Sequence, residues 1–473
     1  MRRTWITVGL LVGTFLASIE ATVVGTAMPS IAEQLGGFHL FSWVFSAYLL
    51  AQTISIPLYG RLADLLGRRA TYVAGVSLFL VGSVACGLAP SMELLVAARA
   101  LQGLGAGCVL PLTMTIFGDL YEVQLRTKLQ GLFSLVWGVS SVVGPLAGGA
   151  IVLHWSWRWV FLSNLPFGLV ALALVGVLLR EPARARREHR LDVAGAALLS
   201  AATMLLLVSL LPAEQRPQGL PAAVWLGLAA AAALGFVLVE RRHPEPLVPL
   251  DLFRDRVHLA ANGAGVLLGV VLFGIVGYVP LYVQGVRGGT PVEAGAMLIP
   301  LSLGWTAASI VAGRLVRRVG FQFLVRFGSA LIAAGAALAL IELWRGVPLL
   351  GLIGLTAYGV GMGCCISSFT VSVQERVPPT RRGIATALTQ FSRTIGGSIG
   401  VALLGALLLS VVGQDPTAGG DLAAIAPALR DKLVQGLGAV FTAMAAAAIA
   451  AGIVGILLFP RVEEGMVGPP RRP

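Results

Sequence analysis

Long apolar runs are the feature that most constrains this chain. A helix needs about 20 mostly apolar residues to cross a bilayer, and about fourteen such runs follow one another along the sequence. They span residues 5–28, 40–60, 70–89, 93–118, 127–153, 160–180, 192–212, 221–240, 258–283, 292–316, 323–343, 347–374, 382–411 and 434–459. With only 12% Asp, Glu, Lys and Arg, the chain has too little polar surface for a water-soluble fold. The sequence therefore predicts an all-α integral membrane protein embedded in the lipid bilayer.

The basic residues are distributed unevenly between these runs. Lys and Arg number 34 against 22 Asp and Glu, which gives a net charge of +12. Most of the basic residues lie before the first run, after the last run, or in every second loop between them, and cytoplasmic loops carry such an excess. We therefore expect an even number of spans with both termini in the cytoplasm. The positive charge then has a topological cause and indicates no nucleic-acid partner.

A short segment occurs twice in the sequence. Residues 60–69 (GRLADLLGRR) end the second run, and residues 313–320 (GRLVRRVG) end the tenth run with the same Gly-x-Leu and final-Gly spacing. Many transporters are built from internal repeats that rock about a substrate site near the membrane midplane. We expect an N-terminal six-helix bundle in 1–190, two linker transmembrane helices and a cytoplasmic loop in 191–257, and a C-terminal six-helix bundle in 258–473.

Two of the motifs resemble those of a known transporter family. Residues 60–69 match the loop motif G-x-L-a-D-x-x-G-r-r at every defining position, and residues 18–29 (SIEATVVGTAMP) are similar to the span 1 signature L-D-x-T-I-V-N-V-A-L-P. The span 1 segment departs from the signature at Glu20, where Asp is usual, and at Gly25, where Asn is usual. Together these segments resemble the major facilitator superfamily, and within it the fourteen-span drug:proton antiporter family of the EmrB/QacA type.

Further segments support the same resemblance. In span 4, Arg99, Gln102 and Gly103 are similar to the R-x-x-Q-G-x-G motif, and residues 157–166, 284–300 and 390–400 also look like this family. In span 5 the segment from Ser140 resembles the antiporter motif G-x-x-x-G-P-x-x-G-G, with Ser140 in place of its first Gly. The resemblance implies a major facilitator fold with two extra helices. It also implies a conformational latch at Gly60, Asp64, Gly67, Arg68 and Arg69, and an antiporter motif at Gly144, Pro145, Gly148 and Gly149.

Three ionisable residues fall well inside the apolar runs, namely Glu20, Arg99 and Arg393. Charge at membrane depth is costly, so a functional role is the first hypothesis for each of them. Burial disfavours the anion of Glu20, whereas a nearby arginine or water favours it, and we therefore expect Glu20 to exchange a proton for cargo. The alternative is a permanent ion pair of Glu20 with Arg99 or Arg393 that only fixes helix packing. The resemblance places Arg99 against Glu20 or backbone carbonyls, and we expect Arg393 at a central cavity.

Other polar and aromatic side chains receive weaker expectations. Asp119, Glu240, Glu342 and Glu375 lie at the ends of runs, where we expect them to be solvated. Aromatic and amide side chains can bind flat lipophilic molecules with little directional demand. The candidates for lining such a cavity are Trp43, Tyr48, Gln52, Trp137, Phe273, Tyr278, Tyr282, Trp305 and Gln390. The alternative for each aromatic residue is a place in the belt at the membrane surface.

The remaining signals concern energy source and chemistry. The sequence has no G-x-x-x-x-G-K-[ST] run, and its four Cys and five His have no metal-site or catalytic spacing, so we expect no cofactor, no metal and no enzyme activity. The predicted function is proton-coupled export of small lipophilic, cationic drugs by alternating access. We expect a monomer in the bacterial inner membrane, driven by the proton gradient. Export of an endogenous lipid, siderophore or antibiotic stays open, and a membrane-embedded enzyme is the rival class.

Overall fold

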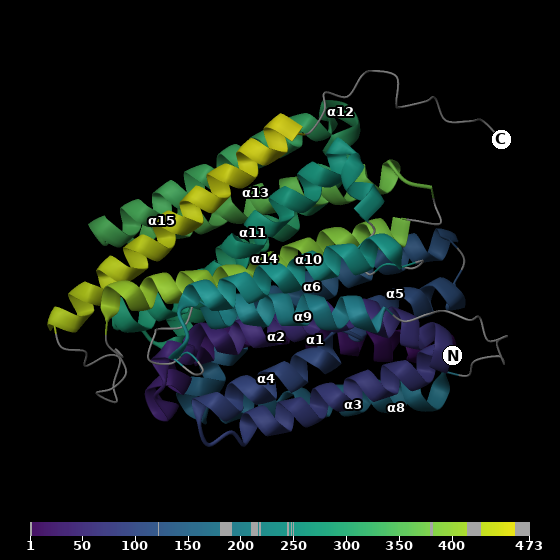
Figure 1. The fold of residues 1–473 in the computed structure, drawn as a ribbon, viewed down its shortest axis with the longest axis horizontal. Helices are drawn as coiled ribbons and strands as arrows, with labels where there is room; N and C mark the ends of the chain where they lie inside the picture. The colour runs from purple at the N-terminus through teal and green to yellow at the C-terminus, as the bar shows by residue number, and fades with distance from the viewer. Residues whose placement is uncertain are drawn as a thin grey trace. The chain divides into compact units, whose positions relative to one another are not determined.

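The computed structural model describes residues 2–121, 123–179, 192–209, 216, 219–243, 246, 248, 250–378, 382–413 and 427–458. All regular secondary structure in these residues is helical (Figure 1). In chain order the helices are α1 Arg2–Leu35, η1 Phe38–Leu40, α2 Phe41–Leu66, α3 Arg68–Gly87, α4 Met92–Ala106, α5 Val109–Leu120, α6 Val123–His154, α7 Arg158–Leu162, α8 Asn164–Leu178, α9 Val193–Ser209, α10 Ala222–Arg242, η4 Leu250–Arg254, α11 Arg256–Leu281, η5 Tyr282–Val286, α12 Pro291–Arg345, α13 Pro348–Glu375, α14 Arg382–Val412 and α15 Pro427–Leu458. The all-α prediction is confirmed.

The described helices support a multi-pass membrane protein. Twelve segments of the described residues are long and apolar enough to cross a bilayer. Two further apolar segments, Gly138–His154 within α6 and Ala194–Leu206 within α9, are shorter than a typical span. The structure thus contains about twelve candidate membrane helices, and the count of fourteen spans stays a prediction.

Glycines with positive φ mark the two copies of the repeated segment. Gly67 has φ 90° and ψ 154° and separates α2 from α3. Gly320 has φ 79° and ψ 160° and interrupts α12, which therefore consists of two helices joined at a sharp turn. Residues other than glycine rarely adopt this backbone conformation. The repeat seen in the sequence therefore corresponds to the same backbone turn in both places.

Two other predicted runs differ in detail from the observed helices. The run 93–118 forms two helices, α4 and α5, which meet at Gly107 and Cys108. Gly107 packs against α2, and a methyl group on it would lie 2.8 Å from the backbone oxygen of Gln52. The end of α11 after Pro280 continues as the π-helix η5. Proline lacks the N–H that a regular helix needs, and such local widening is frequent at functional sites.

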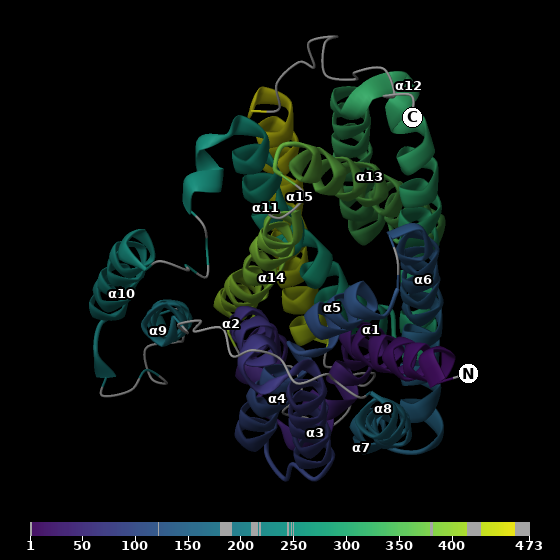
Figure 2. The same ribbon diagram turned by 90° about the vertical axis from the view of Figure 1, so that its right-hand side faces the viewer.

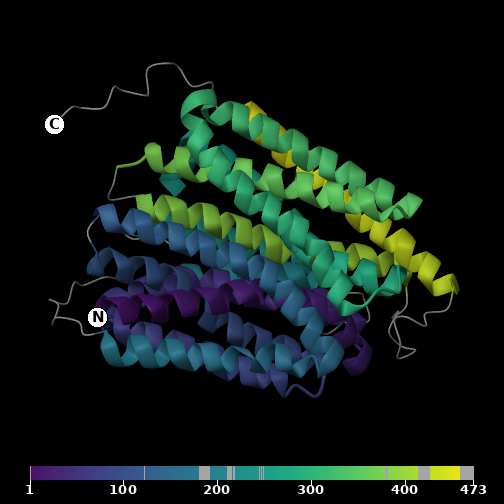
Figure 3. The same ribbon diagram turned by 180° about the vertical axis from the view of Figure 1, so that it is seen from behind.

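The described residues group into two compact units. The first unit comprises Met1–Pro249, Phe273–Ile299 and Gly397–Val440, and the second comprises Leu250–Leu272, Pro300–Gly396 and Phe441–Pro473. Within the first unit, α1 packs against α6 and α8, and α4 packs against α2 and α3. Figure 3 shows α1, in purple, alongside α8. In Figure 2, α9 and α10 lie side by side as a pair. The predicted boundaries at residues 190 and 257 stay predictions.

Close backbone contact fixes the position of α4 in the first unit. A methyl group on Gly82 of α3 would lie 2.5 Å from the backbone nitrogen of Gln102. On the other side, a methyl group on Gly103 would overlap the carbonyl oxygen of Tyr48 on α2. Small residues allow such close approach between helices in lipid. This packing holds the polar residues of α4 inside the unit, where they meet those of α1.

Candidate functional site

Glu20 lies near the middle of α1 and is 1% exposed. Nη1 of Arg99, on α4, donates to Oε1 of Glu20 and forms an ion pair with it. Nδ2 of Asn164, at the start of α8, donates to Oε2 at 2.6 Å. Each oxygen of the carboxylate therefore has a hydrogen-bond donor, one charged and one neutral.

Arg99 has further partners besides the acid. Its Nε donates to the backbone oxygen of Val44 at 3.2 Å, and its Nη1 also donates to Oε1 of Gln102 at 2.6 Å. The guanidinium carbon lies 4.0 Å from the ring centroid of Tyr48 and 5.8 Å from that of Phe161. An aromatic face attracts a cation, and the attraction is larger where water is excluded. The side chain is therefore held by one acid, two neutral oxygens and two rings.

A second layer of hydrogen bonds connects these partners to α3. Oγ of Ser83 accepts from Nε2 of Gln102 at 2.7 Å and from Nδ2 of Asn164 at 3.0 Å. Sγ of Cys86 donates to Oε1 of Gln102 at 3.6 Å. We call Glu20, Ser83, Arg99, Gln102 and Asn164 the buried polar cluster. Its members come from α1, α3, α4 and α8, and each is buried.

The cluster has the composition that a buried ion pair requires. Removing two charges from water costs several kcal/mol per ion, and mutual attraction offsets this only when further hydrogen bonds satisfy the remaining atoms. Asn164 supplies such a bond to the acid, and Gln102 and Val44 supply them to the base. The pair can therefore persist inside the membrane while keeping a titratable group there.

Sequence reasoning identified part of this cluster. Glu20 and Arg99 stood out as charges inside apolar runs, and the structure brings them together as the resemblance implied. Gln102 entered only as part of the span 4 motif, although it follows Arg99 by three residues and so shares its helix face. Asn164 entered only as part of the segment 157–166. Ser83 carries no signal of its own, because a serine in an apolar run is common.

Arg393 lies on α14 in the second unit. Its Nη2 donates to Oε1 of Gln390, and its guanidinium carbon is 5.8 Å from the ring centroid of Trp305. Nε2 of Gln390 in turn donates to Oγ1 of Thr394 at 3.5 Å. Within the part of the chain that the structure describes, no carboxylate forms an ion pair with Arg393. Two predicted cavity residues, Trp305 and Gln390, thus surround a half-buried cation that lacks an acidic partner there.

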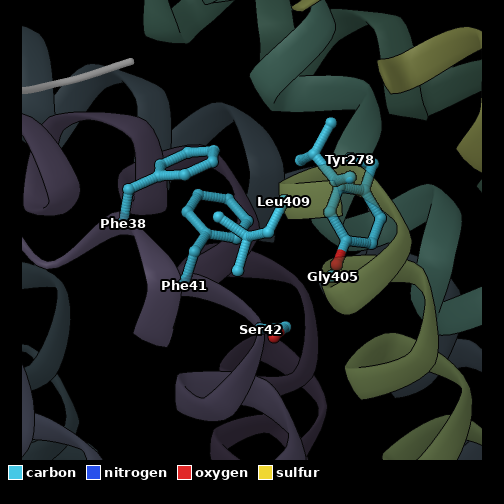
Figure 4. Close-up of a pocket in the computed structure, with 7 residues that line it drawn as sticks. Phe38, Phe41, Ser42, Tyr278, Gly405 and Leu409 are labelled. Carbon is cyan, nitrogen blue, oxygen red and sulfur yellow. The ribbon is translucent and has the colours of Figure 1, made fainter. Parts of the chain in front are cut away.

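The remaining cavity candidates occupy different environments. Tyr278 and Tyr282 are buried, and Tyr278 donates to the backbone oxygen of Val401 at 3.0 Å. Trp43, Gln52 and Phe273 are half-buried, whereas the side chain of Trp137 lies outside the described residues. Tyr278 also stacks on Phe41, with ring centroids 6.1 Å apart. Figure 4 shows these two rings at a small hollow lined by Phe38, Phe41, Ser42, Tyr278, Gly405, Leu408 and Leu409.

Further contacts in the first unit join early helices to late ones. Ser46 on α2 donates to the backbone oxygen of Ser398 on α14 at 2.8 Å, and Ser398 donates back to the oxygen of Ser46 at 2.9 Å. Nε2 of Gln284 donates to the backbone oxygen of Thr26 on α1 at 3.1 Å. A methyl group on Gly25 would overlap the carbonyl oxygen of Val276 on α11. Together these contacts form what we call the helix seal.

The span 5 motif is placed in α6 between two neighbouring helices. A methyl group on Gly148 would lie 2.8 Å from the backbone oxygen of Val23 on α1, and one on Gly149 would lie 2.7 Å from backbone atoms of Pro291 and Val292 on α12. Gly144 faces Thr22 in the same way, and Pro145 lies within the helix. These glycines therefore permit close contact between α6 and its neighbouring helices.

The loop motif is only partly described. Gly67 forms the turn given above, Gly60 lies in α2, and Nη1 of Arg68 donates to the backbone oxygen of Thr115 at 3.4 Å. Arg69 is exposed. The side chain of Asp64 lies outside the described residues, so its part in a latch stays a prediction.

Two of the acids expected to be solvated are buried instead. Glu240 and Glu342 are each 3% exposed, and Oε2 of Glu240 accepts from the backbone nitrogen of Val248 at 3.2 Å. That expectation was wrong, because tertiary packing buries both acids. Glu375 is exposed, and the side chain of Asp119 is outside the described residues. No group of three or more His, Cys, Asp or Glu that could hold a metal occurs in the described residues.

Comparisons with known proteins identify the family. The sequence model of the Major Facilitator Superfamily matches residues 10–401. The multidrug transporter protein MdtP of Bacillus subtilis (strain 168) is 34% identical over 418 residues, which cover 86% of this chain and 75% of MdtP. The multidrug resistance protein Stp of Mycobacterium tuberculosis (strain ATCC 25618 / H37Rv) is 32% identical over 399 residues, which cover 84% of this chain and 74% of Stp.

Solved structures show the same fold. A bacterial homologue of the human lysosomal transporter Spinster, in an inward-facing and unoccupied conformation, superposes with a TM-score of 0.71 at 17% identity over 97% of both chains. A D-xylose–proton symporter superposes with a TM-score of 0.68 at 14% identity, over 97% of this chain and 98% of the symporter. The family and these relatives point to a transporter rather than an enzyme. This chain belongs to the Major Facilitator Superfamily and has its all-α membrane-transporter fold.

Proposed function

We propose that this protein is a proton-coupled antiporter that exports small lipophilic, cationic molecules by alternating access. The names of the relatives, a multidrug transporter and a multidrug resistance protein, support drug efflux. The observation that carries the proton coupling is Glu20, a buried carboxylate on α1 whose positive partner, Arg99, is itself buried among neutral oxygens and an aromatic ring.

The cluster suits a group that gains and loses a proton. When water reaches Glu20 from the side at lower pH, a proton neutralises the carboxylate and weakens its attraction to Arg99. Arg99 then keeps the oxygens of Gln102 and Val44 and the face of Tyr48, so its charge is not left without partners. When Glu20 faces the cytoplasm it releases the proton, and the restored anion favours a cationic cargo.

The helix seal supports alternating access. Its hydrogen bonds join α2 to α14 and α1 to η5, so each links the predicted N-terminal bundle to the predicted C-terminal bundle. A few neutral hydrogen bonds are worth about 0.5–1.5 kcal/mol each, so such a contact can open and re-form during a transport cycle. We propose that the seal closes one side of the pathway in this conformation.

The topology belongs to the same proposal. We propose fourteen spans of the EmrB/QacA type, with α6 and α9 as the two spans that complete the count. The 32 residues of α6 exceed the length of a single span, and α9 packs mainly against α10 as an extra helix pair. Both termini would then face the cytoplasm of a bacterial inner membrane. The loop motif around Asp64 would act as a latch, and the protein would work as a monomer without a cofactor.

Replacement of Glu20 by Gln tests the coupling. Glu20→Gln keeps the shape and an acceptor for Arg99 but cannot exchange a proton. In proteoliposomes with an acidic lumen, uptake of tetraphenylphosphonium driven by the pH gradient should fall to the level of protein-free vesicles. The matched control is Glu375→Gln, at an exposed acid, which should transport as the unmodified protein does.

Fold integrity is checked on the same samples by size-exclusion profile and melting temperature in detergent. If Glu20→Gln is well folded and still shows full gradient-driven uptake, the coupling proposal fails. Glu20 would then be a packing residue, paired with Arg99 only to hold α1 against α4.

A further inference from the structure

Only one of the two polar atoms in the Asn164 amide has hydrogen-bond partners. Its Nδ2 donates to Oε2 of Glu20 at 2.6 Å and to Oγ of Ser83 at 3.0 Å. Its Oδ1 is buried and has no hydrogen-bond partner. Asn164 is 1% exposed, so water from the surface does not reach this oxygen in the present conformation. A buried acceptor without a donor costs free energy, and such an atom in a native structure calls for an explanation.

Rotation of the amide exchanges its donor and its acceptor. A half-turn about the last side-chain bond of Asn places Oδ1 where Nδ2 now lies, with little change in shape. Oδ1 would then face Oε2 of Glu20 and Oγ of Ser83. While Glu20 is an anion this arrangement is repulsive, because two acceptors meet. Once Oε2 carries a proton, the acid O–H can donate to Oδ1, and the Ser83 hydroxyl can donate to it as well.

We propose that Asn164 is a positioning residue that serves both protonation states of Glu20, by donating to the carboxylate and, after rotation, accepting from the acid. The inference rests on the proposed proton exchange at Glu20 and adds the residue that makes the exchange possible in a buried site. The proton comes from water at the open side and binds Oε2. No covalent bond changes apart from the O–H bond formed at Oε2. In either state one polar atom of the Asn164 amide lacks a hydrogen-bond partner.

Other titratable groups near Glu20 are held by separate contacts. Arg99 from α4 faces Oε1, which is the opposite oxygen. The phenol of Tyr48 on α2 lies under Arg99, and the thiol of Cys86 on α3 donates to Gln102. On α7, Arg158 donates to the oxygen of Ala89 and lies over Trp157, and the helix α8 that carries Asn164 has no titratable side chain.

Infrared difference titration of the purified protein tests the proposal without any transported ligand, because it follows protonation of Glu20 directly. The band of the protonated Glu20 carboxyl is identified by its loss in Glu20→Gln, and its midpoint pH is recorded. In Asn164→Leu the anion loses a charge-assisted bond, which is stronger than the neutral bond lost by the acid. We expect the midpoint to move to higher pH by about one unit, a tenfold change in proton affinity.

Asn262→Leu is the matched control. Asn262 is a buried amide on α11, in the second unit, that donates to the backbone oxygen of His258 and accepts from the hydroxyl of Ser392. The Asn262→Leu variant should leave the midpoint pH of Glu20 unchanged. Asn164→Asp provides a second variant that keeps the size and polarity of the site. Two adjacent carboxyls share a proton, so its midpoint should move further to higher pH.

The rotation itself is read from the Asn164 carbonyl band, assigned by isotope-labelled asparagine and its absence in Asn164→Leu. Oδ1 has no donor beside the anion and gains donors beside the acid, so acidification should lower the frequency of this band. An unshifted Glu20 midpoint in both Asn164 variants, or a carbonyl band that ignores Glu20 protonation, overturns the inference. Loss of transport coupling is scored separately by Glu20→Gln, so the two proposals can fail independently.

Discussion

Two arginines inside the membrane spans of this transporter, Arg99 and Arg393, are stabilised in different ways. Arg99 is 2% exposed and has an acid, two neutral oxygens and a stacked tyrosine around its guanidinium. Arg393 is half-buried and has one amide oxygen and a more distant tryptophan, with no acidic partner among the described residues. The difference indicates that full burial of a cation here requires a counter-charge, whereas a partly exposed cation is tolerated without one.

The comparison also separates two kinds of role. A paired arginine holds its acid in place and can influence when that acid takes a proton. An unpaired arginine leaves a positive field in its surroundings that an anionic or polar group can enter. The largest consequences should therefore follow from breaking the pair, and smaller ones from removing the unpaired charge.

Removal of Arg99 should have the largest effect. Arg99→Gln leaves Glu20 buried without its cation, and breaking one side of a buried pair typically costs about 3–5 kcal/mol. We expect a clear fall of the melting temperature in detergent and loss of gradient-driven uptake of tetraphenylphosphonium. The double variant Glu20→Gln with Arg99→Gln should melt above Arg99→Gln, because both charges are gone. If the double variant melts no higher than Arg99→Gln, the unpaired charge of Glu20 is not the cause of the lower melting temperature.

Removal of Arg393 should change the melting temperature less than removal of Arg99 does, and should not lower it. Arg393→Gln loses one hydrogen bond to Gln390 but also removes a half-buried charge that lacks an acidic partner in the described structure. We expect a melting temperature equal to or slightly above that of the unmodified protein. A fall as large as that of Arg99→Gln would contradict the comparison, because Arg393 would then have a counter-charge of similar strength.

The part of the site that the sequence predicts is the part that carries charge. Glu20 and Arg99 are visible because an ionisable residue in an apolar run is expensive, and that cost is a property of the sequence alone. The partner of the second carboxylate oxygen, Asn164, is neutral and lies 144 positions along the chain from Glu20. Only the packing of α8 against α1 brings the two together, so no local pattern could reveal the contact.

Predictions that depended on exposure were less secure than those that depended on helix position. The apolar runs locate the helices, and the repeated Gly-x-Leu segment predicts the matching turns at Gly67 and Gly320. Glu240 and Glu342 were expected in water because they end apolar runs, yet both are buried by tertiary packing. Hydropathy reports how far a helix extends, but it contains no information on which neighbouring segment covers the end.

The smallest predicted effect concerns a second charged pair, Asp255 and Arg376, which lies outside the membrane spans. Oδ2 of Asp255 accepts from Nη1 of Arg376 at 3.2 Å, and Oδ1 accepts from the backbone nitrogens of Val257 and His258 at the start of α11. Partial burial acts to raise the pKa of Asp255, but these donors and the charge of Arg376 outweigh it and hold the pKa below its usual value. Unlike the Glu20 pair, this pair is about one-third exposed and is screened by water.

A lowered pKa in the folded state means that the anion of Asp255 stabilises the fold above its unfolded pKa of about 3.9, and that this contribution is lost as the pH falls through the folded value. Asp255→Asn should therefore lower the melting temperature slightly at neutral pH and by progressively less in acid, until the two proteins melt together. The check is a series of melting curves from neutral to acidic pH, with Arg376→Gln as the companion variant. A difference that stays constant across the series would mean that Asp255 acts through its shape as a helix cap. Exposed and buried pairs would then differ in mechanism as well as in strength.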